Sequence, residues 1–219
     1  MSFTTSEENY IKSIFHLQQQ TGLVNTNALA AEMKTRAASV TDMLIKLKGK
    51  KLLQYEKYKG FKLNEAGKKT ALDVIRKHRL WEFFLVVHLK FDWDKVHSIA
   101  EDLEHISSEE LIQRLDNFLG NPSFDPHGDP IPDKHGKIPV INQQSLSVIP
   151  IKKLVTVSSV SNQSAQMLEM LKHYHIALGT QLTVNRKFEF DGSLEIKVLK
   201  QSACIISEQV AKNVFVHDI

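Results

Sequence analysis

One stretch rich in proline and glycine divides this chain into two parts whose sequence patterns predict different secondary structures. Residues 120–139 contain five of the six prolines and three of the nine glycines, so they predict a loop and linker rather than a helix or strand. Before this stretch, apolar residues recur at helical spacing. After Pro150 they come in short alternating runs that are typical of strands. The pattern predicts a mainly α chain that ends in a small β-barrel.

The first part of the chain reads as helices followed by a hairpin. Asn25 or Thr26 is a plausible N-cap for the second helix, and Ser39 for the third. Short strands turn at Lys59-Gly60. The expected helices are Glu7–Gln20, Thr26–Lys34 and Val40–Lys50, and the expected strands are Leu52–Tyr58 and Phe61–Leu63. This order is that of a winged helix-turn-helix, which we place at residues 1–64.

The remainder divides into a helical domain, residues 65–139, and the β-rich domain, residues 150–219. Asp191-Gly192 between two apolar runs is a strong hairpin signal. The helical patterns run over about Glu65–Leu89, Asp94–Glu104, Ser108–Leu119 and, within the β-rich part, Ser164–His173. The expected strands of that part are Leu154–Val157, Gln181–Val184, Phe188–Phe190, Leu194–Leu199, Cys204–Ile206 and Val214–Val216.

Charge is distributed unevenly along the chain. Residues 33–63 contain nine basic residues against Asp42 and Glu56 alone, whereas residues 101–116 contain six acidic residues against Arg114 alone. A basic module beside an acidic one predicts a polyanion as partner of the first. The acidic module is either a cation site or a solvated helix face.

The basic module predicts a DNA-reading surface, with the second helix of the motif in the major groove. Small side chains at its beginning allow close approach of the backbone to base edges, and basic residues contact phosphates. The residues expected at DNA are Arg36, Ala38, Ser39, Thr41, Asp42, Lys46, Lys57 and Lys59. The alternative is a helical hairpin whose lysines are merely solvated.

The acidic module carries a cluster of imidazole and carboxylate groups. His97, Glu101, Glu104 and His105 are spaced i, i+4, i+7 and i+8, which predicts one helix face. His78 and Glu82 form a further i, i+4 pair on the preceding helix. Mixed ligation of this kind suits Mn(II), Fe(II), Zn(II) or Co(II). Alternatively, these are ordinary surface residues of an amphipathic helix, or the site of a metal-dependent enzyme.

Other features narrow the class of protein. The sequence contains no HExxH helix, nucleophile elbow or phosphate-binding glycine loop, which argues against an enzyme. Its N-terminal MSFTTSEENY lacks a signal-peptide pattern, and no apolar stretch is long enough to span a membrane. The single cysteine, Cys204, fits a reducing compartment. We therefore expect a cytoplasmic protein.

Several stretches resemble the diphtheria-toxin repressor and manganese-transport regulator family of metal-dependent transcriptional repressors. They are Glu8-Asn9-Tyr10-Ile11, RAASVTDMLIKL (36–47), YEKYKGFKLNEAGKK (55–69), HRLWE (78–82), EDLEH (101–105) and NPSFDPHGDPIP (121–132). The resemblance implies a winged helix-turn-helix, a helical metal-binding and dimerisation domain, and an SH3-like C-terminal domain. It also implies a homodimer that binds a palindromic operator in double-stranded DNA.

The resemblance further implies a set of metal ligands. The primary site would use Glu101, Glu104 and His105 with Asn9, and the second site His78, Glu82 and His97. Possible further ligands are Glu8, Asp125, His127, Gln163 and Gln166. Glu101 stands where iron-sensing relatives have cysteine, which favours Mn(II) as co-repressor over Fe(II); Zn(II) or Co(II) can substitute in vitro.

Two positions depart from the family pattern. Asn9 replaces an aspartate or methionine, and a neutral amide is a weaker ligand, so Glu8 is an alternative. Position 12 is lysine, which argues against a fully binuclear manganese site. The rival hypotheses are therefore an Fe(II)-responsive repressor and a winged-helix regulator that has lost metal control.

Overall fold

The computed structural model describes residues 3–56, 59–106, 108–199 and 201–218. Lys57, one of the residues expected at DNA, lies outside them. The chain forms two compact units. The first contains residues 1–78, 103–109 and 132–138, and the second contains residues 79–102, 110–131 and 139–219.

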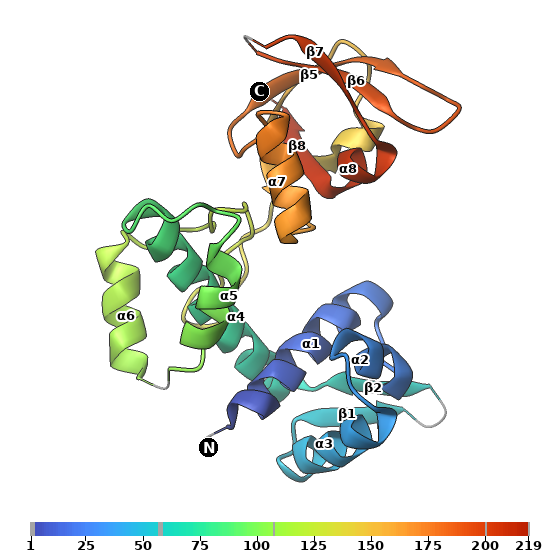
Figure 1. Ribbon diagram of the computed structural model, residues 1–219. Coiled ribbons are helices and arrows are strands. Elements are labelled where there is room, and N and C mark those ends of the chain that lie inside the picture. Colours follow the sequence, from blue (N-terminus) through green and yellow to red (C-terminus); the bar gives the residue numbers. More distant parts are fainter. Residues whose placement is uncertain (1–2, 57–58, 107, 200, 219) are drawn as a thin grey trace. The chain divides into compact units, whose positions relative to one another are not determined.

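The first unit begins with three helices whose ends follow local capping rules. They are α1 (Thr5–Thr21), α2 (Thr26–Glu32) and α3 (Ala37–Gly49) (Figure 1). Thr4 and Glu7 form a capping box on α1, and the Asn25 side chain accepts from the amide of Ala28 at 2.8 Å. The predicted beginning of the third helix at Val40 was wrong, because α3 begins at Ala37 and Ser39 lies in its first turn.

A two-stranded antiparallel hairpin follows, as predicted. Strand β1 (Leu53–Glu56) pairs with β2 (Gly60–Leu63). Phe61 also forms a bridge with Val24, which holds the hairpin beside the segment after α1. Gly60 has φ +132°, and a Cβ there would lie 2.4 Å from the Val24 carbonyl oxygen. Only glycine fits this turn without displacing the backbone.

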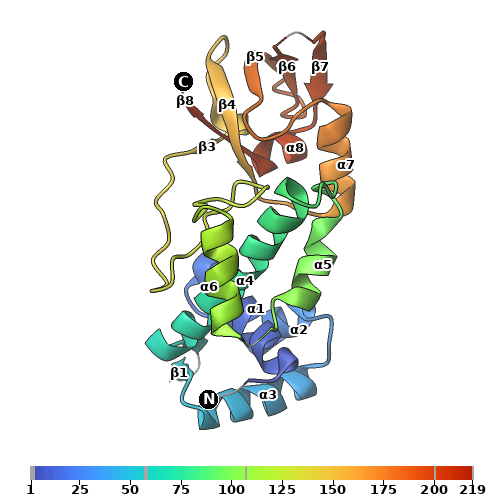
Figure 2. The same cartoon turned by 90° about the vertical axis from the view of Figure 1, so that its left-hand side faces the viewer.

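An apolar core joins these helices to the hairpin and to the beginning of α4 (Glu65–Val87). Ile11, Ile14, Leu29 and Leu47 are fully buried in it, and each such side chain contributes about 1.5–3 kcal/mol by leaving water. Helix α4 is one continuous helix (Figures 1 and 2). It therefore supplies side chains to both units.

The second unit contains the end of α4, most of α5 (Val96–Leu103) and most of α6 (Glu109–Phe118). Leu80, Ile112, Leu115 and Ile131 form a small core here. Because α5 ends at Leu103, the prediction that Glu104 and His105 share a helix face with His97 and Glu101 was wrong.

The rest of the second unit is a six-stranded antiparallel sheet of order β3-β8-β4-β5-β6-β7. Strands β3, β8 and β4 lie side by side in Figure 2. The strands are β3 (Gln144–Ser145), β4 (Leu154–Val160), β5 (Gln181–Lys187), β6 (Leu194–Val198), β7 (Ala203–Ile206) and β8 (Val214–Asp218). The prediction of a strand at Phe188–Phe190 was wrong, because these residues lie in the turn of the β5–β6 hairpin.

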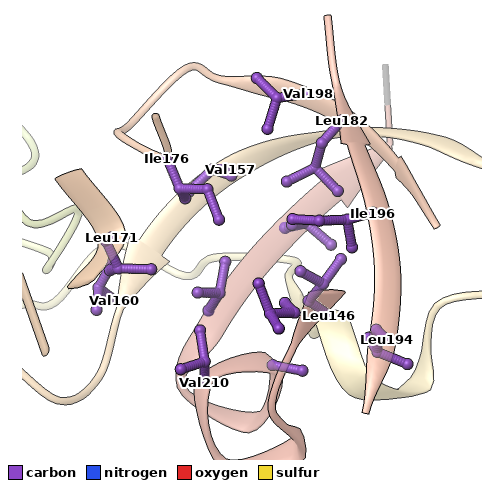
Figure 3. Packing of buried hydrophobic residues seen from close by; sticks show 14 of the residues in the cluster. Leu146, Val157, Val160, Leu171, Ile176, Leu182, Leu194, Ile196, Val198 and Val210 are labelled. Atoms are coloured by element: carbon purple, nitrogen blue, oxygen red, sulfur yellow. The ribbon is translucent and has the colours of Figure 1, made fainter. Parts of the chain in front are cut away.

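The sheet curls around one apolar core (Figure 3). Register shifts in β4, between Val157 and Ser159, and in β5, between Val184 and Arg186, add the local bend that such curling needs. Helix α7 (Ala165–His173) contributes Leu168 and Leu171 to the core. A short 3₁₀ turn (Leu146–Val148) and helix α8 (Glu208–Asn213), neither of which was predicted, also contribute.

Candidate functional site

Five charged or imidazole side chains meet in the first unit, and we call them the N-terminal cluster: Glu8, Lys12, His78, Glu104 and His105. His78 Nδ1 donates to Glu104 Oε2 at 2.5 Å, and Lys12 Nζ donates to Glu104 Oε1 at 2.5 Å. His105 Nδ1 lies 2.5 Å from Glu8 Oε2, and its Nε2 lies 3.6 Å from Glu104 Oε1. The cluster links α1 to the segment that follows α5.

Glu104 is the centre of the N-terminal cluster and is fully buried. Burial alone raises the pKa of its carboxyl group. The hydrogen bond from His78 and the positive charge of Lys12 outweigh that effect, so the pKa of Glu104 lies below its ordinary value. The carboxylate is therefore ionised and compensated by groups of the protein itself.

A second group, which we call the buried centre, lies in the second unit and consists of Glu82, Asp125 and His127. Each offers one ligand atom, and these atoms lie within 4.8 Å of one another. All three side chains are buried. Among the described residues, Asp125 Oδ2 and His127 Nδ1 have no hydrogen-bond partner. Buried polar atoms of this kind need a partner, and a cation supplies one.

The tautomer of His127 is fixed by the backbone. Its Nε2 lies 2.9 Å from the carbonyl oxygen of Trp93, and a carbonyl oxygen can only accept, so Nε2 carries the hydrogen. The lone pair of the neutral ring then lies on Nδ1, which faces Glu82 Oε2 at 3.5 Å. A backbone carbonyl that orients an imidazole in this way is typical of metal-binding histidines.

The loop that carries Asp125 and His127 is held tightly. Asp125 Oδ1 accepts from the amides of His127 and Asp129 at 2.8 and 2.9 Å. Gly128 has φ +84°, and a Cβ there would lie 1.9 Å from the Ser158 carbonyl oxygen. The amide of Val160 in β4 donates to the His127 carbonyl oxygen at 3.0 Å. The β-sheet thus positions the loop.

Electrostatics in the buried centre favour an added cation. Burial, with the nearby charges of Asp129 and Glu82, raises the pKa of Asp125 to about 7. Burial lowers the pKa of His127, but Glu82 outweighs burial and the net shift is upward. The Arg79 guanidinium, 3.7 Å from Asp125 Oδ2, opposes this rise in the pKa of Asp125 but does not cancel it, so a further positive charge favours the ionised carboxylate.

The other residues predicted to bind metal differ in their exposure and in their neighbours. His97 Nδ1 lies 3.3 Å from Glu82 Oε1, and its Nε2 lies 3.7 Å from Glu101 Oε1. His97 and Glu101 are about half exposed. His78 stands one turn before Glu82 on α4. Asn9 is half-buried on α1, beside the Glu8 that contacts His105.

Sequence reasoning missed two residues that brace the buried centre, Arg79 and Asp129, and named a third, Gln163, only as a possible metal ligand. Asp129 Oδ2 accepts from Arg79 at 3.2 Å and from Gln163 Nε2 at 3.0 Å. The Arg79 guanidinium also lies 3.7 Å from Asp125 Oδ2. Gln163 thus contacts Asp129, while Gln166 is exposed. A periodicity analysis of single helices cannot find a contact between α4, the loop and the segment before α7.

The described residues predicted to contact DNA lie on an exposed surface of the first unit. Ala38, Ser39, Asp42 and Lys46 are exposed along α3, and Ile45 beside them is 64% exposed. Arg36 and Thr41 are also exposed, as is Lys59 in the hairpin turn. Lys50 differs, because its Nζ pairs with Glu7 Oε2 at 2.7 Å. It ties α3 to α1.

A winged helix-turn-helix, helices that bring carboxylate and imidazole groups together, and an SH3-like sheet define the class of metal-responsive DNA-binding regulators. Family models agree in each part. The N-terminal DNA-binding domain of iron-dependent repressors matches residues 2–61, their metal-binding and dimerisation domain matches residues 64–133, and the FeoA domain matches residues 144–218. The chain belongs to the diphtheria-toxin repressor and manganese-transport regulator family, which confirms the predicted fold class.

The similar proteins include transcriptional regulators named MntR and iron-dependent repressors named IdeR. The transcriptional regulator MntR of Bacillus subtilis is 33% identical over 116 residues, which cover 53% of this chain and 81% of that protein. The iron-dependent repressor IdeR of Mycobacterium tuberculosis is 33% identical over 126 residues, which cover 57% of this chain and 54% of that protein. The chain thus spans about half the length of IdeR.

Solved structures match over nearly the whole chain. A manganese-dependent transcriptional repressor in complex with manganese is 31% identical, with a TM-score of 0.87, and the match covers 97% of this chain and all of that one. ScaR with bound Cd²⁺ is 28% identical, with a TM-score of 0.82 and coverage of 97% and 99%. Among the described residues, no helix is long and apolar enough to cross a membrane.

Proposed function

We propose that this chain is a metal-activated transcriptional repressor that responds to Mn(II) and regulates metal-ion homeostasis in the cytoplasm. The observation that carries the proposal is the buried centre: ligand atoms of Glu82, Asp125 and His127 lie within 4.8 Å of one another. Among the described residues, Asp125 Oδ2 and His127 Nδ1 have no hydrogen-bond partner. The family models and the manganese-bound relative support it. We assign the chain no enzymatic role.

The buried centre fits a divalent transition metal held by Glu82, Asp125 and His127. Two carboxylates and one imidazole form a largely oxygen donor set, which favours Mn(II) or Fe(II) over metals that prefer thiolate. Zn(II) or Co(II) can bind the same donors in vitro. His97 Nδ1, at 3.3 Å from Glu82 Oε1, is a candidate fourth ligand. When bound, the ion supplies a positive charge beside Asp125, whose pKa is raised in its absence, and so favours the ionised carboxylate of that residue.

In the proposed regulator, α3 enters the major groove. Ser39, Thr41 and Asp42 contact base edges, and Arg36, Lys46 and Lys59 contact phosphates. Two such helices are presented by a homodimer whose half-sites are one helical turn of DNA apart. For the dimer contact we propose the aromatic surface of α4 and α6, where Phe118 is 64% exposed and packs on His88 and Phe84.

DNA binding tests the proposal directly. The full chain is used to select operators from random double-stranded DNA in Mn(II), and the best sequence is then titrated in Mn(II), Fe(II), Zn(II) or chelator. We expect affinity to rise at least about 10-fold with Mn(II), within the range of allosteric couplings. Asp125→Asn removes the rise, whereas the exposed control Asp102→Asn retains it.

Two results would contradict this function. Tight operator binding that ignores the chelator would support a winged-helix regulator without metal control. A stronger response to Fe(II) than to Mn(II), measured without oxygen, would support the iron-responsive alternative.

A further inference from the structure

The N-terminal cluster contains its own cation. Lys12 Nζ lies 2.5 Å from Glu104 Oε1, and the Lys12 side chain is only 15% exposed while that of Glu104 is fully buried. The two residues are 92 positions apart in the chain. A lysine that is largely buried needs a close counter-charge, so this pair is a specific tertiary contact and not a chance surface ion pair.

Both oxygens of Glu104 are already engaged by protein donors. Oε2 accepts from His78 Nδ1, and Oε1 accepts from Lys12 Nζ. His105 Nε2 lies 3.6 Å from the same Oε1, while its Nδ1 contacts Glu8. The ammonium therefore lies at the oxygen where a metal shared by Glu104 and His105 would bind.

A divalent ion does not fit this arrangement. It would have to displace the ammonium or lie within a few ångströms of it, and like charges at that distance repel strongly in a buried site. Among the described His, Cys, Asp and Glu residues of the first unit, no group of three places its ligand atoms within 4.8 Å of one another. Asn9 adds only a neutral amide.

We propose that Lys12 takes the place of a metal ion in the N-terminal cluster, so that Glu104 and His105 bind no regulatory ion. Lys12 and Glu104 then join α1 to residues 104–105 at any metal concentration. That the chain binds a regulatory ion elsewhere rests on the proposed function. The proposal for Lys12 differs from the sequence-based expectation that Glu104 and His105 belong to the primary metal site.

Metal counting tests the inference. Mn(II) binding to metal-free, full-length protein is measured from the electron paramagnetic resonance signal of free Mn(II). We expect Asp125→Asn to lose a tight ion that the wild type binds, and Glu104→Gln to lose none. Lys12→Glu, which replaces the cation by a carboxylate next to Glu104 and His105, gains a further ion. Lys69→Glu, at an exposed position of α4, gains none.

Thermal unfolding in chelator gives a readout that does not depend on metal. Lys12→Met leaves Glu104 buried without its cation, so we expect a melting temperature lower by on the order of 10 °C. Lys69→Met is the matched control and should melt like the wild type. A Lys12→Met protein as stable as the wild type would overturn the role of Lys12.

The outcomes separate this inference from the proposed function. Two tight ions in the wild type, one of them lost in Glu104→Gln, overturn the inference and leave the metal-activated repressor intact. The same holds for a single ion that survives Asp125→Asn and is lost in Glu104→Gln. If the wild type binds no Mn(II), the Mn(II)-responsive function fails, and the melting experiment alone decides whether Lys12 is the structural cation.

Discussion

The N-terminal cluster and the buried centre contain the same kinds of side chain but differ in how their charges are balanced. In the first, Lys12 and His78 donate to both oxygens of Glu104. In the second, Asp125 Oδ2 and His127 Nδ1 are buried without a hydrogen-bond partner among the described residues. A group of carboxylates and imidazoles is thus recognised as a candidate ion site by buried ligand atoms that lack a hydrogen-bond partner, not by its residue types alone.

Removing the charge at the centre of the N-terminal cluster should destabilise the protein whether or not metal is present. Glu104→Gln removes the charge that faces Lys12 and His78, and we expect the free energy of unfolding to fall by about 3 kcal/mol. Urea denaturation in chelator and in Mn(II) measures it, with the exposed Glu110→Gln as control. A loss that Mn(II) restores would contradict the distinction between the two groups.

Removing a carboxylate of the buried centre should lower the affinity for metal and leave the metal-free protein stable. Asp125→Asn retains Oδ1 for the loop hydrogen bonds and removes a buried charge. We expect Mn(II) affinity to fall by about 100-fold or more, with no decrease in the unfolding free energy of the metal-free protein. Calorimetric titration and urea denaturation together check this, and a variant that loses stability but not affinity would reverse the assignment.

The bracing of the buried centre should have a smaller effect. Asp129→Asn weakens the contacts to Arg79 and Gln163, so Asp125 is held less firmly. We expect Mn(II) affinity to fall by about 10-fold, as for other residues that orient metal ligands. Asp133→Asn, in a neighbouring turn where Asp133 caps two backbone amides, is the control. Equal losses in both variants would mean that loop stability alone matters.

The smallest expected effect lies outside both groups. Lys59→Ala in the hairpin turn should lower affinity about equally for all DNA sequences, and the slope of log affinity against log salt should become shallower by about 0.9. Fluorescence anisotropy at several salt concentrations measures the slope, with Lys69→Ala as control. A loss confined to the operator would mean that Lys59 reads bases.

Local patterns predicted the helices and the hairpin well. Asn25 caps α2 as expected, and the apolar residues Val40, Leu44 and Leu47 form the buried face of α3. The errors occurred where tertiary contacts override local signals. Phe188–Phe190 has strand-like composition, but β5 already ends at Lys187 and the chain turns there.

The candidate site was only partly predictable for a similar reason. Spacing placed Glu104 and His105 on the same face as Glu101, but α5 ends at Leu103. Periodicity could not predict that a loop would bring Asp125 and His127 to Glu82, although the family resemblance named both as possible ligands. Lys12 stood out as an unusual residue, but its partner lies 92 positions away, beyond any local pattern.

The stacking of Trp93 on His127 gives the molecule a built-in optical probe. The two rings lie 5.7 Å apart at 21°, and the indole packs against the core of the β-sheet. The chain has only two tryptophans, so replacing Trp81 by phenylalanine would leave one emitter beside the buried centre. Its fluorescence would then follow occupancy in real time, in an unlabelled protein and in the presence of DNA.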